Sequence, residues 1–115
     1  MTQYLLNNLA PTGGTIEPAR LQEIAERITA ITNEMQSAGV WVFAMGLADP
    51  SSSTVVSTSD GRVVLADGPF AELKEHVGGF TVIDVADLDE ATRWAGRVSE
   101  ATGLRIEVRP ALSFG

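Results

Sequence analysis

Two aspartates are the residues of this chain whose type and surroundings best suit acid–base chemistry. Asp67 precedes Gly68-Pro69, and Asp84 stands within an apolar run of β-forming residues. A carboxylate that is partly desolvated at a cleft can act as a general acid or base. Each aspartate also has a structural interpretation, because Asp is typical of turns and helix caps. Asp67 and Asp84 are therefore candidate catalytic residues for which both roles stay open.

The run of residues 67–80 combines several turn and helix signals. Gly68 tolerates a positive φ, and Pro69 fixes φ for a turn or for the first turn of a helix. Residues 71–75 are good helix formers, enough for about one turn. Gly78-Gly79 then predicts a sharp entry into a strand. The residues proposed for a ligand cleft or for this loop are Trp41, Asp67, Gly68, Pro69, Phe70, Lys74, Gly78 and Gly79.

The chain offers few other groups for chemistry. It has one histidine, His76, and no cysteine, so thiolate metal sites and cysteine nucleophiles are excluded. His76 is predicted to lie in an exposed loop, with a titrating catalytic role as the alternative. The acidic residues between 84 and 90 are explained by helix capping and the helix dipole. No metal and no cofactor is therefore predicted.

The composition limits the classes of protein to which this chain can belong. The 115 residues are predicted to form one domain, residues 1–115, with a formal net charge of -7 and no run of Lys or Arg. This charge disfavours nucleic-acid binding, which needs a basic surface. No secretory signal is visible, and the longest apolar stretch, residues 40–48, is too short to span a bilayer. We expect a cytoplasmic protein that contacts neither nucleic acid nor membrane.

The elements that must position these residues follow from the periodicity of the apolar side chains. Gln3–Leu6 is predicted to be a short strand that Asn7-Asn8 interrupts. Apolar residues at helical spacing predict a helix from Glu17-Pro18 to Gly39. Residues 40–47 are almost continuously apolar, which predicts a strand that is buried on both faces.

The second half of the chain opens with a hairpin signal. Asp60-Gly61 separates two β-rich runs, residues 54–57 and 62–66. Three further elements are predicted: a strand over residues 80–86, a helix that Asp87 and Glu90 cap and Gly103 ends, and a strand over residues 104–109.

This order predicts an α+β fold, the ferredoxin-like split βαβ arrangement with an inserted β-hairpin. Both helices would cover one face of the sheet. The other face has too much apolar surface to stay in water, so a second copy is expected to cover it. The prediction is a homodimer with its sheets packed face to face, a dimeric α/β barrel.

The chain also resembles the DGPF-type branch of the YCII-related family, from about Glu17 to Pro110. The resemblance is strongest at Asp67-Gly68-Pro69-Phe70, along residues 83–91, and at Val108-Arg109-Pro110. It implies the same fold and the same dimeric α/β barrel. Since similar proteins occur beside or fused to alternative sigma factors, it also implies a possible regulatory protein partner.

One departure from the family's pattern argues against catalysis. Some similar proteins have a His-Asp pair with the histidine on or near the first long helix, and this chain has no histidine there. The leading hypothesis is therefore a homodimer that binds a small molecule between sheet and helices or acts as an accessory partner. The alternative is an enzyme that uses Asp67 or Asp84 on a small organic substrate. A purely structural or interaction module is the third hypothesis.

Overall fold

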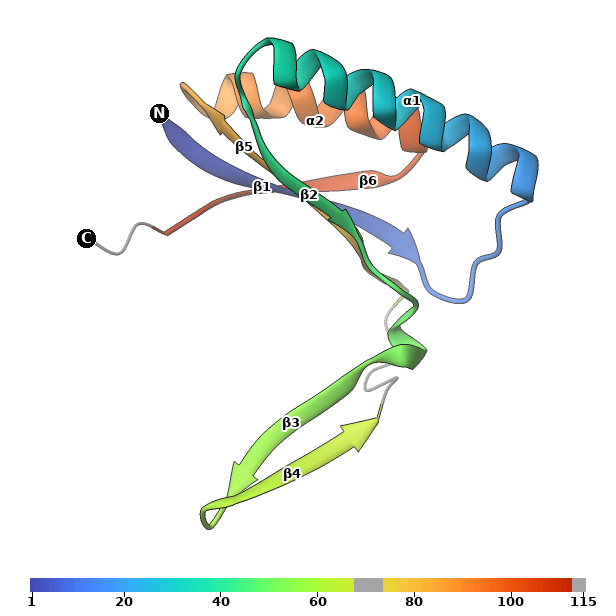
Figure 1. The fold of residues 1–115 in the computed structure, drawn as a ribbon, viewed down its shortest axis with the longest axis vertical. Helices are drawn as coiled ribbons and strands as arrows, with labels where there is room; N and C mark the ends of the chain where they lie inside the picture. Colours follow the sequence, from blue (N-terminus) through green and yellow to red (C-terminus); the bar gives the residue numbers. More distant parts are fainter. Residues whose placement is uncertain (68–73, 113–115) are drawn as a thin grey trace.

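The computed structural model describes residues 1–67 and 74–112. The elements are β1 (Thr2–Pro11), α1 (Pro18–Ser37), β2 (Trp41–Gly46), the short 3-10 helix η1 (Pro50–Ser52), β3 (Thr54–Ser59), β4 (Arg62–Asp67), β5 (Glu75–Val85), α2 (Leu88–Thr102) and β6 (Arg105–Pro110). Four strands form an antiparallel sheet in the order β2-β5-β1-β6, and both helices cover one of its faces (Figure 1). The predicted ferredoxin-like α+β fold with an inserted hairpin is confirmed.

The hydrophobic core lies between the sheet and the two helices. Leu6 of β1 and Ile83 and Val85 of β5 are fully buried, and Met35 of α1 packs against them. The burial of each such side chain contributes about 1.5–3 kcal/mol to folding. The alternation of buried residues along β1 and β5 fixes which face of the sheet meets the helices.

Both helices end where local signals predicted. Gly39 has φ 73° after α1 and Gly103 has φ 74° after α2, and glycine adopts this left-handed conformation without a steric penalty. Asp87 accepts a hydrogen bond from the backbone N–H of Glu90 at 2.9 Å. The Glu90 carboxylate in turn accepts one from the N–H of Ala86 at 2.9 Å. Asp87 and Glu90 therefore form a reciprocal cap at the start of α2.

The prediction that Asn7-Asn8 interrupts the first strand is wrong. β1 runs through both residues and pairs with β5 on one side and β6 on the other. Asn7 is buried, and its Nδ2 donates a hydrogen bond to Oε1 of Glu107 at 2.8 Å. Ladders on both sides and a satisfied side-chain amide outweigh the low β-propensity of asparagine.

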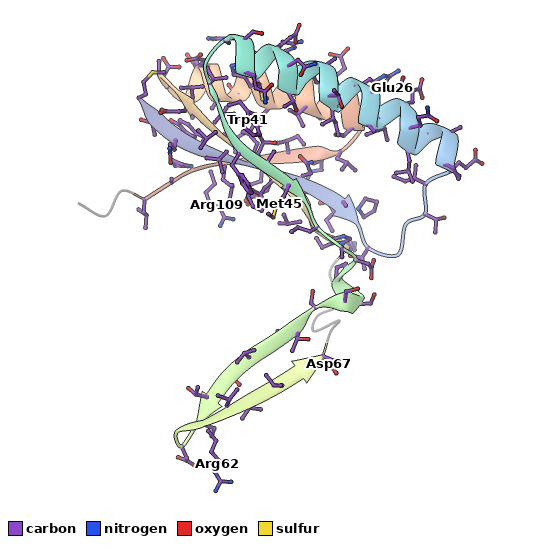
Figure 2. All side chains as sticks on the ribbon, in the orientation of Figure 1. Glu26, Trp41, Met45, Arg62, Asp67 and Arg109 are labelled. Carbon is purple, nitrogen blue, oxygen red and sulfur yellow. The ribbon has the colours of Figure 1, made fainter. Side chains whose placement is uncertain are left out.

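In the single chain one face of residues 40–47 is uncovered, and the predicted burial on both faces requires a second copy over that face. β2 is an edge strand, and Phe43 and Met45 are each 45% exposed. They point away from the helices, as Figure 2 shows for Met45. Strand pairing puts further apolar residues on the same side. We call this side the open face; its apolar residues are Leu5, Phe43, Met45, Phe80 and Val82.

The hairpin β3–β4 forms a separate two-stranded sheet, and its prediction is confirmed. Asp60 and Gly61 have φ 51° and 76°, as a two-residue hairpin turn requires. Figure 1 shows the hairpin extending from the end of the main sheet, on the side away from the helices.

The predicted turn at Gly78-Gly79 is instead part of β5, which begins at Glu75. Asn8 pairs with Gly79 and Leu9 with Val77, so Gly78 is the extra residue of a β-bulge. A Cβ at Gly79 would lie 3.0 Å from the Met45 carbonyl oxygen. Gly79 therefore permits a close approach of two strands where a turn had been predicted.

Candidate functional site

An open cleft of about 570 Å³ lies between the end of β1, the start of α1 and the segment after β2. Its apolar wall is made by Ile16, Leu21, Leu47 and Leu104, and its ionisable side chains are those of Asp49 and His76. Ile16, Leu21 and Leu47 are exposed large apolar residues, so the cleft offers apolar surface that a ligand can cover.

The bulge in β5 brings His76 to this cleft. Beyond Gly78 the ladder pairs His76 with Ala10, and paired residues point to the same face of a sheet. Ala10 lies two residues after Asn8, on the face of β1 that meets the helices, and both paired residues line the cleft. Thr12 Oγ1 lies 3.3 Å from Nδ1 of His76. The predicted exposed loop position of His76 is therefore wrong, because His76 is a half-buried strand residue.

Asp49 comes from the short connection that follows β2. It caps η1 by accepting a hydrogen bond from the backbone N–H of Ser51 at 2.9 Å. Hydrogen bonds from the side chain and then the backbone of Ser51 hold the pKa of Asp49 below its ordinary value of 3.8, and a charged His76 lowers it further. The Asp49 carboxylate is therefore ionised at neutral pH and gives the cleft a fixed negative charge.

The polar groups of the cleft allow two kinds of chemistry. The contact with Thr12 occupies one ring nitrogen of His76, and the tautomer decides whether that nitrogen donates or accepts. An imidazole held in this way can hydrogen-bond a ligand or transfer a proton. Asp49 favours ligands that are neutral or cationic over anions.

The predicted site residues of the 67–80 run lie in different places. Asp67 ends β4, is exposed, and accepts a hydrogen bond from Thr54 Oγ1 at 3.3 Å across the hairpin. The carbonyl oxygen of Lys74 accepts one from the N–H of Thr12 at 2.9 Å. Gly78 lines the cleft, whereas Gly79 packs against β2. The remaining predicted residues, Gly68, Pro69 and Phe70, lie outside the described residues.

Trp41 and Asp84 lie apart from the cleft. Trp41 packs against the core between sheet and helices (Figure 2). Asp84 pairs with Gln3 near the opposite end of β5, beside a hollow of about 360 Å³. Its Oδ1 is buried and has no hydrogen-bond partner among the described residues. The structure thus does not bring Asp67, Asp84 and Trp41 together.

Asp49 is the cleft residue that the sequence analysis missed. Its sequence signal was Asp49-Pro50-Ser51, which is typical of a capped turn at a fixed place. A further hollow of about 380 Å³ lies between the helices, but Arg27, Arg97 and Glu100 make much of its wall. It offers a ligand less apolar surface than the cleft.

Two kinds of feature are absent from the described residues. Among residues 1–67 and 74–112, no three His, Asp or Glu side chains gather closely enough to hold a metal ion. No helix in that part of the chain is long and apolar enough to cross a membrane.

The chain is similar both to a protein family and to an individual protein. The family model of the YCII-related domain matches residues 6–114, which include most of the sheet, both helices and the cleft. The chain is also similar to "Uncharacterized protein R00369" of Rhizobium meliloti (strain 1021). The two are 35% identical over 92 residues, which cover 77% of this chain and 73% of the relative.

Proposed function

Because this chain belongs to the YCII-related family, we propose that it is a small homodimeric protein that binds an organic molecule in the cleft of Asp49 and His76. The cleft supports this proposal most directly. It combines an apolar wall with a few polar groups, as small-molecule sites generally do. The apolar wall would contribute affinity, and the polar groups would fix the orientation of the ligand.

The charges of the cleft narrow the class of ligand. Asp49 is ionised and the chain has a net charge of -7, so an anionic ligand is disfavoured. Leu47 and Leu104 suit a ring or a short aliphatic chain. We propose a small ligand with an apolar body and a neutral or cationic hydrogen-bonding group, such as an amine or a phenol.

The first experiment is a thermal-shift screen of the purified protein against small amines, phenols, carboxylic acids and nucleotides. Amines or phenols are expected to raise the melting temperature, because binding to the folded state stabilises it. Asp49→Asn should abolish the effect of an amine. Asp67→Asn is the matched control, because it removes one carboxylate at the base of the hairpin.

The same pair of variants decides where the ligand binds. Loss of the shift in Asp67→Asn alone would move the site to the run of residues 67–80. A well-folded protein that no compound stabilises would contradict the binding proposal and favour a protein partner.

The open face supports the homodimer. Phe43 and Phe80 lie with their ring centroids 6.2 Å apart, and Leu5, Met45 and Val82 extend this apolar surface over three strands. Glu107 and Arg109 border it as an ion pair on β6. An apolar centre with a polar rim is the usual composition of a protein interface. The alternative occupant of this face is a regulatory protein partner, which a monomeric chain would favour.

An enzyme that uses an aspartate as general acid or base is the second candidate. Asp84 favours it, because its buried Oδ1 has no hydrogen-bond partner among the described residues and a hollow lies beside it. Turnover of a small organic substrate should then be lost in Asp84→Asn. Asp67 is the weaker candidate, because its carboxylate is exposed and bonded to Thr54. We further propose membership of the DGPF-type branch, which rests on the sequence of residues 67–70.

A further inference from the structure

The hairpin β3–β4 exposes apolar side chains over its whole length. All six residues of each strand are exposed. The pairing of Val56 with Leu65 and of Thr58 with Val63 puts three aliphatic side chains on one face. We call this the arm face; Val56, Val63 and Leu65 on it are 61%, 67% and 65% exposed. The opposite face includes Ser57, Ser59 and Arg62, and its valines are less exposed.

Such a hairpin needs a partner to be stable. A two-stranded sheet that packs on nothing is marginal in water. Among the described residues, the outer edges of both strands are also unpaired, and natural proteins usually cover such edges or protect them with charge. The arm face has no charged residue between Thr54-Asp67 at its base and the turn at its tip. This surface therefore has the character of an interface.

We propose that the hairpin is an arm that packs its arm face against a second copy of this chain. The inference rests on the homodimer proposed above and adds a second contact to it. Each copy would pack its arm against the other, as the symmetry of a twofold dimer requires.

The reach of the arm fits this occupant. Figure 1 shows the hairpin on the side of the sheet away from the helices, where a copy docked on the open face would lie. Two packed sheets lie about 10 Å apart, and six extended residues span about 20 Å. The arm is thus long enough to pass the shared interface and lie along the flank of the second sheet.

The area of the open face is compatible with the same occupant. β1 and β5 have 10 and 11 residues and β2 and β6 have six each, so the sheet covers roughly 500 Å² of flat surface. Each partner of a standard stable interface buries about 800 Å² of accessible surface. Two exchanged arms would add apolar surface to such an interface.

The charge of the arm disfavours other partners. Its ionisable residues are Asp60, Arg62 and Asp67, of both signs and without a basic cluster. Nucleic acids and anionic lipid surfaces both need such a cluster. An uncharged aliphatic face suits an apolar protein surface.

A crosslinking experiment tests the arm directly. The chain contains no cysteine, so Thr58→Cys gives a unique attachment point for a photo-crosslinker on the arm face. Ser57→Cys is the matched control on the opposite face. In a mixture of isotopically light and heavy protein, the label at position 58 is expected to form crosslinks between copies. Their yield should exceed that from position 57 severalfold, because a photo-crosslinker joins only groups that lie within its reach.

The dimer dissociation constant gives a second measurement. Leu65→Lys should raise it about tenfold, whereas Val64→Lys on the other face should change it less than about threefold. Circular dichroism of both variants checks that the fold is retained, and Leu65→Thr replaces Leu65→Lys if it is not.

The outcomes test the arm and the homodimer as two separate proposals. A dimer without crosslinks between copies, or with equal effects of the two lysine variants, overturns the arm and leaves the dimer proposal standing. A protein that sediments as a monomer overturns both.

Discussion

At the scale of single residues, Glu107 has a well-defined electrostatic environment. Hydrogen bonds from Arg109 and then from Asn7 hold the pKa of Glu107 below its ordinary value of 4.5. A carboxylate whose pKa is lower in the folded state contributes stability above its unfolded pKa and loses it as the pH falls through the folded pKa. Glu107→Gln should therefore remove part of the stability at neutral pH and little of it in acid.

Chemical denaturation from about pH 7 to about pH 3 measures this difference. The free energy of unfolding of the wild type should approach that of Glu107→Gln as the pH falls. Arg109→Gln should also make the free energy of unfolding less dependent on pH, because it removes the first of the two hydrogen-bond donors to Glu107. A constant gap between wild type and Glu107→Gln across this range would contradict the assignment.

The cap of α2 gives a second prediction at this scale. Asp87→Ala should destabilise the protein by about 1 kcal/mol, because the N–H of Glu90 loses its acceptor. Asp87→Asn should cost only a few tenths of that amount, since asparagine caps helices about as well as aspartate. Urea unfolding of the two variants measures both values, and equal losses would mean that the side-chain bond does not matter.

At the scale of elements, the approach of β2 to β5 depends on Gly79. Gly79→Ala would place a Cβ 3.0 Å from the carbonyl oxygen of Met45 and 3.2 Å from Cα of Gly46. Both contacts are with backbone, so a strand must shift, and we expect a loss of about 1–3 kcal/mol. Gly46→Ala is the control, because its Cβ would meet nothing within 4 Å. Thermal melts of equal stability for the two variants would refute this close approach.

The elements that the sequence predicted are those whose signals are local. Helix caps, the Asp60-Gly61 turn and the apolar stripe of α1 each depend on neighbours a few residues away. The misjudged elements depend on distant partners. Asn7 is stable within β1 because strands pair with it on both sides and Glu107, a hundred residues later, bonds its amide. In the sequence Gly79 resembles a turn residue, because the strand that it packs against, β2, is distant along the chain.

The candidate site was less predictable for the same reason. Its walls come from five separate segments, and no single segment has the composition of a binding motif. His76 could be identified as the only imidazole, but its place in the cleft depends on a ladder with β1. Asp84 and Asp67 were identified as candidates from their neighbours, and the structure leaves them in separate surroundings.

At the scale of the whole molecule, the open face predicts how the protein assembles. Phe43→Asp should shift the sedimentation of the protein from dimer to monomer, because it would bury an unpaired charge at the interface. Leu88→Asp is the control, since Leu88 is a similarly exposed aliphatic residue at the start of α2, outside the open face. A dimer that survives Phe43→Asp would have to use another surface.

The bulge at Gly78 makes the chemistry of the cleft a matter of strand register. If β5 paired regularly with β1 beyond Gly79, Val77 would stand opposite Ala10, and His76 would point to the other side of the sheet. A slip of one residue would thus exchange an imidazole for an isopropyl group without any change in sequence. Gly78, two positions away, therefore determines which side chain a ligand meets. It matters to the chemistry of the cleft as much as the ionisable residue does.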